Sequence, residues 1–137
     1  MDESAYKTRL VSRVRERPGA YARRVEDKYA VGVLDLIIKL PGYPIVFGEG
    51  KLIKGGFKFA PTLRQYEEGK KIAAARMLPV LIGWKDGQMY LSPWVEFADI
   101  RECASWRGES EIEQLERFIH EQFGRQHSEC RTNAGEV

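Results

Sequence analysis

The strongest structural signal in this sequence is GVLDLIIKLPGYPIVFGEGKLI, residues 32–53. Two apolar runs flank a turn rich in proline and glycine at residues 40–44, which is the pattern of a β-hairpin. Each run carries one acid, Asp35 or Glu49. If the turn is centred near Gly42, the numbers of directly opposed residues sum to about 84, as those of Asp35 and Glu49 do. We therefore predict that the two carboxylates face each other on neighbouring strands.

Lys51 follows Glu49 by two positions, so both side chains point to the same face of their strand. Opposed carboxylates repel and destabilise a sheet unless a proton or a cation lies between them. A divalent metal ion removes this penalty, and Mg²⁺ needs only one or two carboxylates besides waters and substrate oxygens. Asp35, Glu49 and Lys51 thus predict a site for metal-assisted phosphodiester hydrolysis.

The role of Lys51 follows from its charge. At neutral pH fewer than about one lysine in a thousand is uncharged. We therefore expect Lys51 to orient the attacking water and to stabilise the transition state as a cation, with proton abstraction secondary.

The order of Asp35, Glu49 and Lys51 resembles the core of the PD-(D/E)XK nuclease superfamily, and the surrounding residues look like its small, stand-alone VRR-NUC branch. The resemblance covers roughly residues 20–92, about half the chain. It rests on residues 23–27, 32–36 and 47–51 and on Gln65. One departure is Leu34, which stands where a proline usually precedes the aspartate. The resemblance implies an α/β fold of the restriction-endonuclease-like kind, with a mixed central β-sheet flanked by helices.

The resemblance also implies roles for individual residues. Asp35, Glu49, Lys51 and Gln65 would be catalytic, and Gln65 would contact the attacking water or the scissile phosphate. The metal, Mg²⁺ or Mn²⁺, would be held by Asp35, Glu49 and the backbone carbonyl of Gly50, with Glu26 as a further ligand. Small members of the branch often act as homodimers on branched DNA such as Holliday junctions, and such genes are common in phages.

Two of these residues also have structural explanations. Thr62 and Gln65 have the spacing of a capping box at the start of a helix over residues 62–77, a role that is compatible with catalysis. Glu26 equally suits a surface ion pair with Arg23 or Arg24.

The net charge of +2 is unevenly distributed along the chain. Residues 51–76 hold seven basic and two acidic side chains, whereas residues 96–121 hold three basic and eight acidic ones. We expect the basic stretch to hold a phosphate backbone, although a solvated helix face has the same composition. The loop at residues 54–60 adds two aromatics, Phe57 and Phe59, that could stack on a base, although at least one of them is expected in the core. The expected nucleic-acid contacts are Arg23, Arg24, Lys54, Lys58, Arg64 and Lys70.

The rest of the chain shows the periodicities of further helices and strands. We expect a helix over residues 3–17, a first strand over 21–25, a buried strand over 78–84, an outer strand over 88–91 and helical segments over 94–106 and 109–123. Residues 1–124 would form a single nuclease-like domain, and residues 125–137 a polar, disordered tail.

Length and composition exclude several classes of protein. The 137 residues suffice for one core, and 43% hydrophobic with 31% charged residues is typical of a soluble globular domain. No apolar run reaches the roughly 18 residues of a membrane span, and the N-terminus lacks the apolar segment of a signal peptide. We therefore expect a cytoplasmic protein of a phage or bacterium, with no membrane partner.

The sequence thus predicts a metal-dependent DNA endonuclease, structure-selective for branched DNA, with RNA as the alternative polymer. A hypothesis of a different class is a non-catalytic nucleic-acid-binding module that retains the nuclease fold.

Overall fold

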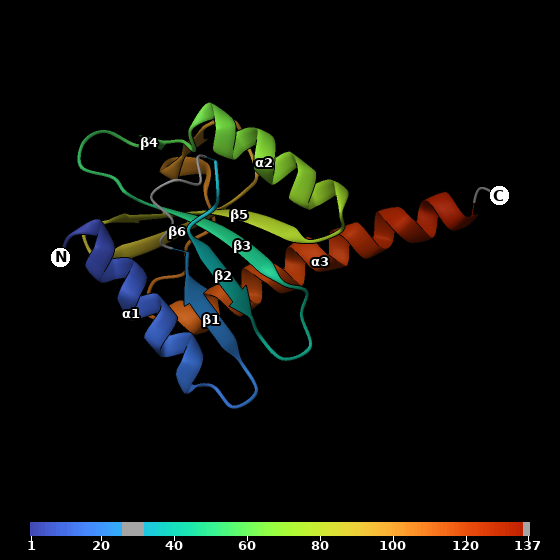
Figure 1. Cartoon of the computed structure of the whole chain (residues 1–137), viewed down its shortest axis with the longest axis horizontal. Coiled ribbons are helices and arrows are strands. Elements are labelled where there is room, and N and C mark those ends of the chain that lie inside the picture. The colour runs from blue at the N-terminus through green and yellow to red at the C-terminus, as the bar shows by residue number, and fades with distance from the viewer. Residues whose placement is uncertain (26–31, 136–137) are drawn as a thin grey trace.

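The structure is a computed structural model that describes residues 1–25 and 32–135, with side chains placed through residue 124. Five strands form a mixed sheet in the order β1-β2-β3-β5-β6, with helices on both of its faces (Figure 1). The strands are β1 Tyr21–Arg24, β2 Leu36–Lys39, β3 Val46–Leu52, β5 Leu78–Lys85 and β6 Gln88–Pro93. The helices are α1 Glu3–Glu16, α2 Leu63–Ala74 and α3 Glu111–Gly135. The predicted α/β fold class is confirmed.

The β3 and β5 strands run parallel, whereas the other neighbouring strands are antiparallel. A parallel pair needs a long crossover connection, and here that connection contains α2. The hairpin has the predicted register, because Leu36 pairs with Gly48 and Ile38 with Val46. The β2 strand begins at Leu36, so Asp35 lies one residue before it, at the position opposite Glu49.

The main core lies between the sheet and the helices α1 and α3. The apolar stripe of α1 is buried there through Tyr6, Leu10, Val11 and Val14, and α3 contributes Ile112, Leu115, Phe118 and Ile119. Trp84 of β5 is fully buried, stacks on Tyr6 with ring centroids 5.4 Å apart, and donates from its indole Nε1 to Glu111 Oε2 at 2.8 Å. These contacts fix α1 against the strand next to β3.

The other face of the sheet carries α2 and a smaller core. A two-residue strand, β4 Lys58–Phe59, pairs with β7 Ala98–Asp99. Phe59 is buried in this cluster, whereas Phe57 is 45% exposed, so one aromatic of the loop enters the core and one does not, as expected. The remainder of the cluster is Ile53, Leu81, Ala98 and Ile100.

The prediction of a helix over residues 94–106 is wrong. The structure has β7 and a short 3₁₀ helix, Ile100–Glu102, in its place. The apolar spacing that indicated a helix has another cause: Ala98 pairs with Phe59 in β4, and Ala104 forms an isolated bridge with Leu91 of β6. Pairing with distant strands therefore overrides the local periodicity.

At the C-terminus, α3 continues to Gly135, although the sequence predicts a disordered tail from residue 125. The segment from 125 to 135 contains no proline, and adding a residue to an existing helix costs far less than starting one. In Figure 1 this part of α3 extends beyond the rest of the molecule. Among the described residues, none of the helices combines the length and the apolar character needed to cross a bilayer.

Candidate active site

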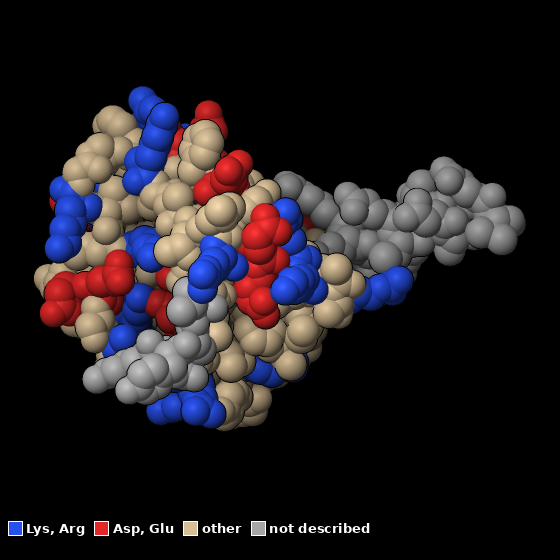
Figure 2. All heavy atoms as spheres, turned by 45° about the horizontal axis from the view of Figure 1, so that its top comes forward, with Lys and Arg blue, Asp and Glu red and all other residues tan. Residues whose placement is uncertain are grey.

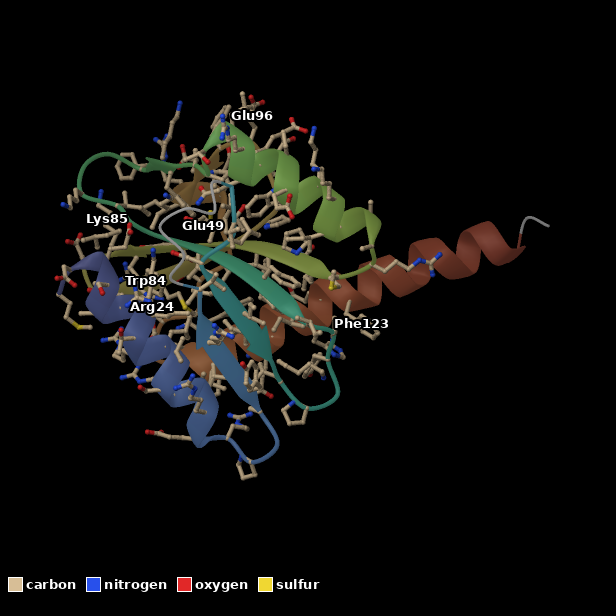
Figure 3. The ribbon with its side chains drawn as sticks, viewed as in Figure 1. Arg24, Glu49, Trp84, Lys85, Glu96 and Phe123 are labelled. Carbon is tan, nitrogen blue, oxygen red and sulfur yellow. The ribbon has the colours of Figure 1, made fainter. Side chains whose placement is uncertain are left out.

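Asp35 and Glu49 meet at the end of the β2–β3 pair. The backbone N–H of Asp35 donates to Glu49 Oε2 at 3.3 Å, and the backbone N–H of Gly50 donates to Asp35 Oδ1 at 3.2 Å. These two crossed hydrogen bonds hold each carboxylate against the backbone of the opposite strand. Figure 3 shows Glu49 over the middle of the sheet, with Trp84 and Arg24 toward α1.

Lys51 lies beside the same acids. Its Nζ is 3.3 Å from Glu49 Oε1, and its side chain is 29% exposed, whereas that of Glu49 is 3% exposed. The strand alternation places both residues on one face, so the structure brings Asp35, Glu49 and Lys51 together in one cluster. Lys51 therefore lies between the buried acid and the solvent.

The buried position of Glu49 has an electrostatic consequence. Burial, together with the nearby Asp35 carboxylate, raises the pKa of Glu49 to about 7, although Lys51 and Lys7 act in the opposite direction. The cluster therefore lacks enough positive charge to keep Glu49 fully ionised at neutral pH.

Helix α1 adds two residues that were not predicted, Glu3 and Lys7. The Lys7 Nζ contacts Asp35 Oδ2 and lies 3.1 Å from Glu3 Oε2, while Glu3 Oε1 accepts a hydrogen bond from the Leu52 backbone at 2.8 Å. Burial alone would lower the pKa of Lys7, but Asp35 and Glu3 outweigh it and raise this pKa. Burial would raise the pKa of Glu3, but the Leu52 N–H and Lys7 hold it below its ordinary value.

The sequence does contain a signal for Lys7. It stands three and four residues before Leu10 and Val11, which places it on the apolar stripe of α1. A lysine on a buried stripe requires a partner, and Glu3 precedes it at the spacing of a helical ion pair. The helical spacing of Glu3 and Lys7 does not indicate that this pair lies at Asp35.

The oxygen atoms of the cluster fit a hard divalent cation. Within the described residues, no three His, Cys, Asp or Glu side chains are arranged to hold a metal ion by themselves. Mg²⁺ does not require three, because it retains several waters and takes oxygens from its substrate. Two adjacent carboxylates, one of them buried with a raised pKa, are a donor set that a divalent cation would stabilise.

Gln65 and Glu26 complete the predicted site residues. The capping box is confirmed: the Thr62 N–H donates to Gln65 Oε1 at 2.9 Å, and the Gln65 N–H donates to Thr62 Oγ1 at 3.2 Å. This cap fixes the Gln65 side chain at the start of α2. Glu26 lies outside the described residues.

The predicted nucleic-acid contacts differ in their surroundings. Arg24 donates to the hydroxyl groups of Ser4 and Thr8 at 2.9 and 3.0 Å, which ties β1 to α1. Lys70 pairs with Glu67 at 3.0 Å. The side chains of Arg23, Lys54, Lys58 and Arg64 are exposed. In Figure 2 basic and acidic side chains alternate in small groups on the face shown, so the excess of basic residues along the sequence does not become a uniform basic surface there.

The loop before β4 gathers aromatic rings and cations. The Phe57 ring lies 4.7 Å from Lys85 Nζ and 4.5 Å from the Arg101 guanidinium carbon, and Lys58 Nζ lies 5.6 Å from the Phe97 ring. Phe57 and Phe97 are both exposed. This arrangement suits a nucleic-acid strand, whose bases stack on rings and whose phosphates pair with cations.

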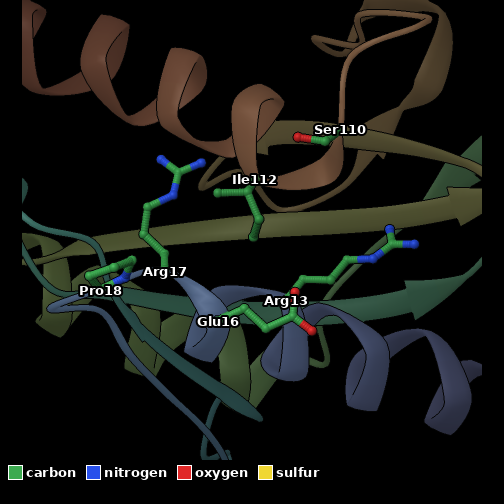
Figure 4. A pocket seen from close by; sticks show the side chains of 6 residues that line it. All are labelled: Arg13, Glu16, Arg17, Pro18, Ser110 and Ile112. Atoms are coloured by element: carbon green, nitrogen blue, oxygen red, sulfur yellow. The ribbon is translucent and has the colours of Figure 1, made fainter.

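A surface pocket lies between the end of α1 and the start of α3 (Figure 4), and it is separate from the cluster of Asp35, Glu49 and Lys51. Its arginines are already engaged, since Arg13 pairs with Glu111 at 2.9 Å and Arg17 contacts Glu116. The pocket is lined by Arg13, Glu16, Arg17, Pro18, Ser110 and Ile112.

Comparison with known proteins identifies the fold. No family model matches this sequence, and no curated protein matches it. Among the solved structures that do match is that of Archaeoglobus fulgidus Hjc, a Holliday junction resolvase from an archaeal hyperthermophile. The TM-score is 0.52 and the identity 13%, over 65% of this chain and 73% of Hjc. The chain has a restriction-endonuclease-like fold. At this identity the likeness extends to the fold alone, so the activity must be argued from the side chains.

Proposed function

We propose that this protein is a metal-dependent DNA endonuclease that hydrolyses phosphodiester bonds at the cluster of Asp35, Glu49 and Lys51. The observation that carries the proposal is the meeting of two carboxylates across one strand end, with a lysine beside the more deeply buried one. A binding protein gains nothing from opposed carboxylates facing a phosphate, whereas a metal-assisted hydrolase needs them.

Asp35, Glu49 and the backbone carbonyl of Gly50 would hold Mg²⁺ or Mn²⁺, with Glu26 as a further candidate ligand. The metal would supply Lewis-acid activation of the phosphate and of the attacking water. Lys51 remains a cation: it orients that water and stabilises the charge that develops on the phosphate. Because the cap occupies Gln65 Oε1, the group that Gln65 offers to the water or phosphate is its amide NH₂.

The DNA backbone would be held by basic side chains around the cluster. The Gly32 backbone packs against Arg64, since a Cβ at position 32 would lie 3.2 Å from the Arg64 Cβ. This contact places the start of α2 beside the segment that leads to Asp35. Phe57, flanked by Lys85 and Arg101, offers a ring for a base. The proposed phosphate contacts are Arg23, Arg24, Lys54, Lys58, Arg64 and Lys70.

Branched DNA is the proposed substrate. The fold shared with a Holliday junction resolvase supports this choice, as does the resemblance of the sequence to small VRR-NUC proteins of phages. The described part of each chain offers one cluster of this kind, and two symmetric cuts require two sites. We therefore propose a homodimer that acts inside the cell where the DNA lies.

The test is a cleavage assay with four-way junction, duplex, flap and single-stranded DNA and with matched RNA, in Mg²⁺, Mn²⁺ or EDTA. We expect the junction to be cut in either metal and not in EDTA. Glu49→Gln, which keeps the shape of the side chain, should lower the rate by at least about 100-fold. Cleavage that persists in EDTA would exclude the metal mechanism.

A non-catalytic nucleic-acid-binding module is the second candidate. One observation favours it: Lys7 already places a cation against Asp35. Tight junction binding without cleavage in both metals would establish this candidate in place of the nuclease.

A further inference from the structure

Lys7 is a buried ionisable residue outside the predicted site. Its side chain is 9% exposed, whereas those of Arg9 and Arg13 on the same helix are 30% and 43% exposed. Lysine is rarely buried unless it is paired. Lys7 has two partners: Asp35 Oδ2, which it contacts, and Glu3 Oε2 at 3.1 Å.

A second observation, independent of these ion pairs, is that the β3 backbone at Gly50 leaves room for the Lys7 side chain. A Cβ at position 50 would lie 3.0 Å from Lys7 Cε and 2.9 Å from Trp84 Cζ3. Both distances are shorter than normal carbon–carbon contacts, so any larger residue would push the lysine stem away. The glycine between Glu49 and Lys51 therefore provides the space through which Lys7 reaches Asp35.

We propose that Lys7 is a built-in counter-cation of the active site, which holds Asp35 in the metal-free protein and moves away from Asp35 Oδ2 toward Glu3 when a divalent metal binds. The inference rests on the proposed function, because it concerns the same carboxylates. A metal ion and an ammonium group that share one carboxylate oxygen repel each other, so the two cations compete.

Glu3 is the carboxylate that would keep Lys7 paired after Lys7 leaves Asp35. It lies one helical turn before Lys7 and is 40% exposed, so the ammonium can keep one carboxylate partner while it leaves Asp35. Lys7 thus acts as a positioning residue: it keeps Asp35 in place before the metal arrives and lowers the affinity of the site for the metal.

The first experiment uses the wild-type protein. Lysines are labelled with an amine-reactive reagent in EDTA and in Mn²⁺, and labelling at each position is measured by mass spectrometry. We expect Lys7 to be protected in EDTA and to react several-fold faster in saturating Mn²⁺. Lys71, with a side chain that is 78% exposed, is the internal control and should react equally in both. Equal protection of Lys7 with bound Mn²⁺ would overturn the inference.

The second experiment compares Lys7→Met, which keeps the apolar stem and removes the charge, with the surface control Lys71→Met. Calorimetric titration should show Mn²⁺ binding at least about 10-fold tighter in Lys7→Met than in the wild type, and unchanged binding in Lys71→Met. In EDTA, the melting temperature of Lys7→Met should fall, and Mn²⁺ should raise it more than it raises that of the wild type. Unchanged or weaker Mn²⁺ binding in Lys7→Met would contradict the inference, and if this variant does not fold, the labelling of the wild type decides.

The outcomes separate this inference from the proposed function. Wild-type protein that binds Mn²⁺ and cuts DNA, with no change in Lys7→Met, would refute only the counter-cation. Binding of Mn²⁺ by both proteins, tighter in Lys7→Met and with Lys7 reactive in the wild type, but without DNA cleavage, would support the counter-cation and refute the nuclease. Absence of Mn²⁺ binding in both proteins would refute both.

Discussion

At the scale of single residues, the protonation of Glu49 is the most testable property of the site. Its pKa is raised from an ordinary 4.5 to about 7, because the side chain is buried and Asp35 lies beside it. Between these values the folded protein holds a proton that the unfolded chain has already released. The folded state therefore binds more protons in this range, and stability must fall as the pH rises through it.

We predict that the metal-free protein in EDTA becomes less stable between pH 5 and pH 8, by at most ~3 kcal/mol from this residue. Thermal unfolding measured across this range gives the slope, and Glu49→Gln should flatten it because the variant cannot titrate. An identical slope in the wild type and in Glu49→Gln would show that Glu49 has an ordinary pKa.

Lys51 gives a second prediction at this scale. Lys51→Arg keeps the positive charge but replaces a compact ammonium with a broad, planar guanidinium beside Glu49. If the position of the charge matters, single-turnover cleavage should fall by about 100-fold while junction binding is retained. Cleavage at the wild-type rate would mean that any cation at this position suffices.

The sequence was sufficient for one part of the site and not for the other. Asp35, Glu49 and Lys51 follow from strand alternation and from the length of one hairpin, which are local properties. Glu3 and Lys7 come from a helix about 30 residues away in the chain, and their position depends on how α1 packs on Trp84. Tertiary packing of this kind cannot be derived from local periodicity.

At the scale of elements, the docking of α2 depends on Gly69. A Cβ at this position would lie 2.0 Å from Trp94 Cε2, and the indole Nε1 of Trp94 donates to the Tyr66 carbonyl at 3.0 Å. Helix propensity alone makes Gly69 a weak point of α2, since glycine costs up to ~1 kcal/mol relative to alanine. The structure shows that Gly69 is the position at which α2 packs against the Trp94 ring.

We predict that Gly69→Ala destabilises the protein despite the better helix propensity of alanine. The displaced Trp94 should cost ~1–3 kcal/mol, which exceeds the gain of up to ~1 kcal/mol. Gly55→Ala is the control, because nothing lies within 4 Å of its Cβ position. A denaturant titration in which Gly69→Ala is as stable as the wild type would contradict this packing of α2.

Local signals explain which elements were predicted. Strand β5 is continuously apolar over residues 78–84 because both of its faces are covered, and the capping box marks the start of α2. Residues 94–106 were assigned wrongly because β7 has only two residues and exists through its pairing with β4. Such a short strand leaves no periodicity in the sequence.

At the scale of the whole molecule, the fold pairs the hairpin with β5 and packs α1 beside it. Lys7 of α1 and Glu49 of β3 therefore both lie at Asp35. The mixed, mainly antiparallel sheet with flanking helices was predicted from the sequence and is confirmed. The likeness to Hjc supports the same arrangement. We propose that this arrangement creates one site for a divalent metal.

The most direct measurement of that claim is a crystal structure of the protein in saturating Mn²⁺, with the metal located by its anomalous scattering. We predict one anomalous peak per chain, in contact with carboxylate oxygens of both Asp35 and Glu49 and with Lys51 beside it. A peak that touches neither acid, or no peak at this position at a Mn²⁺ concentration that supports cleavage, would contradict the account.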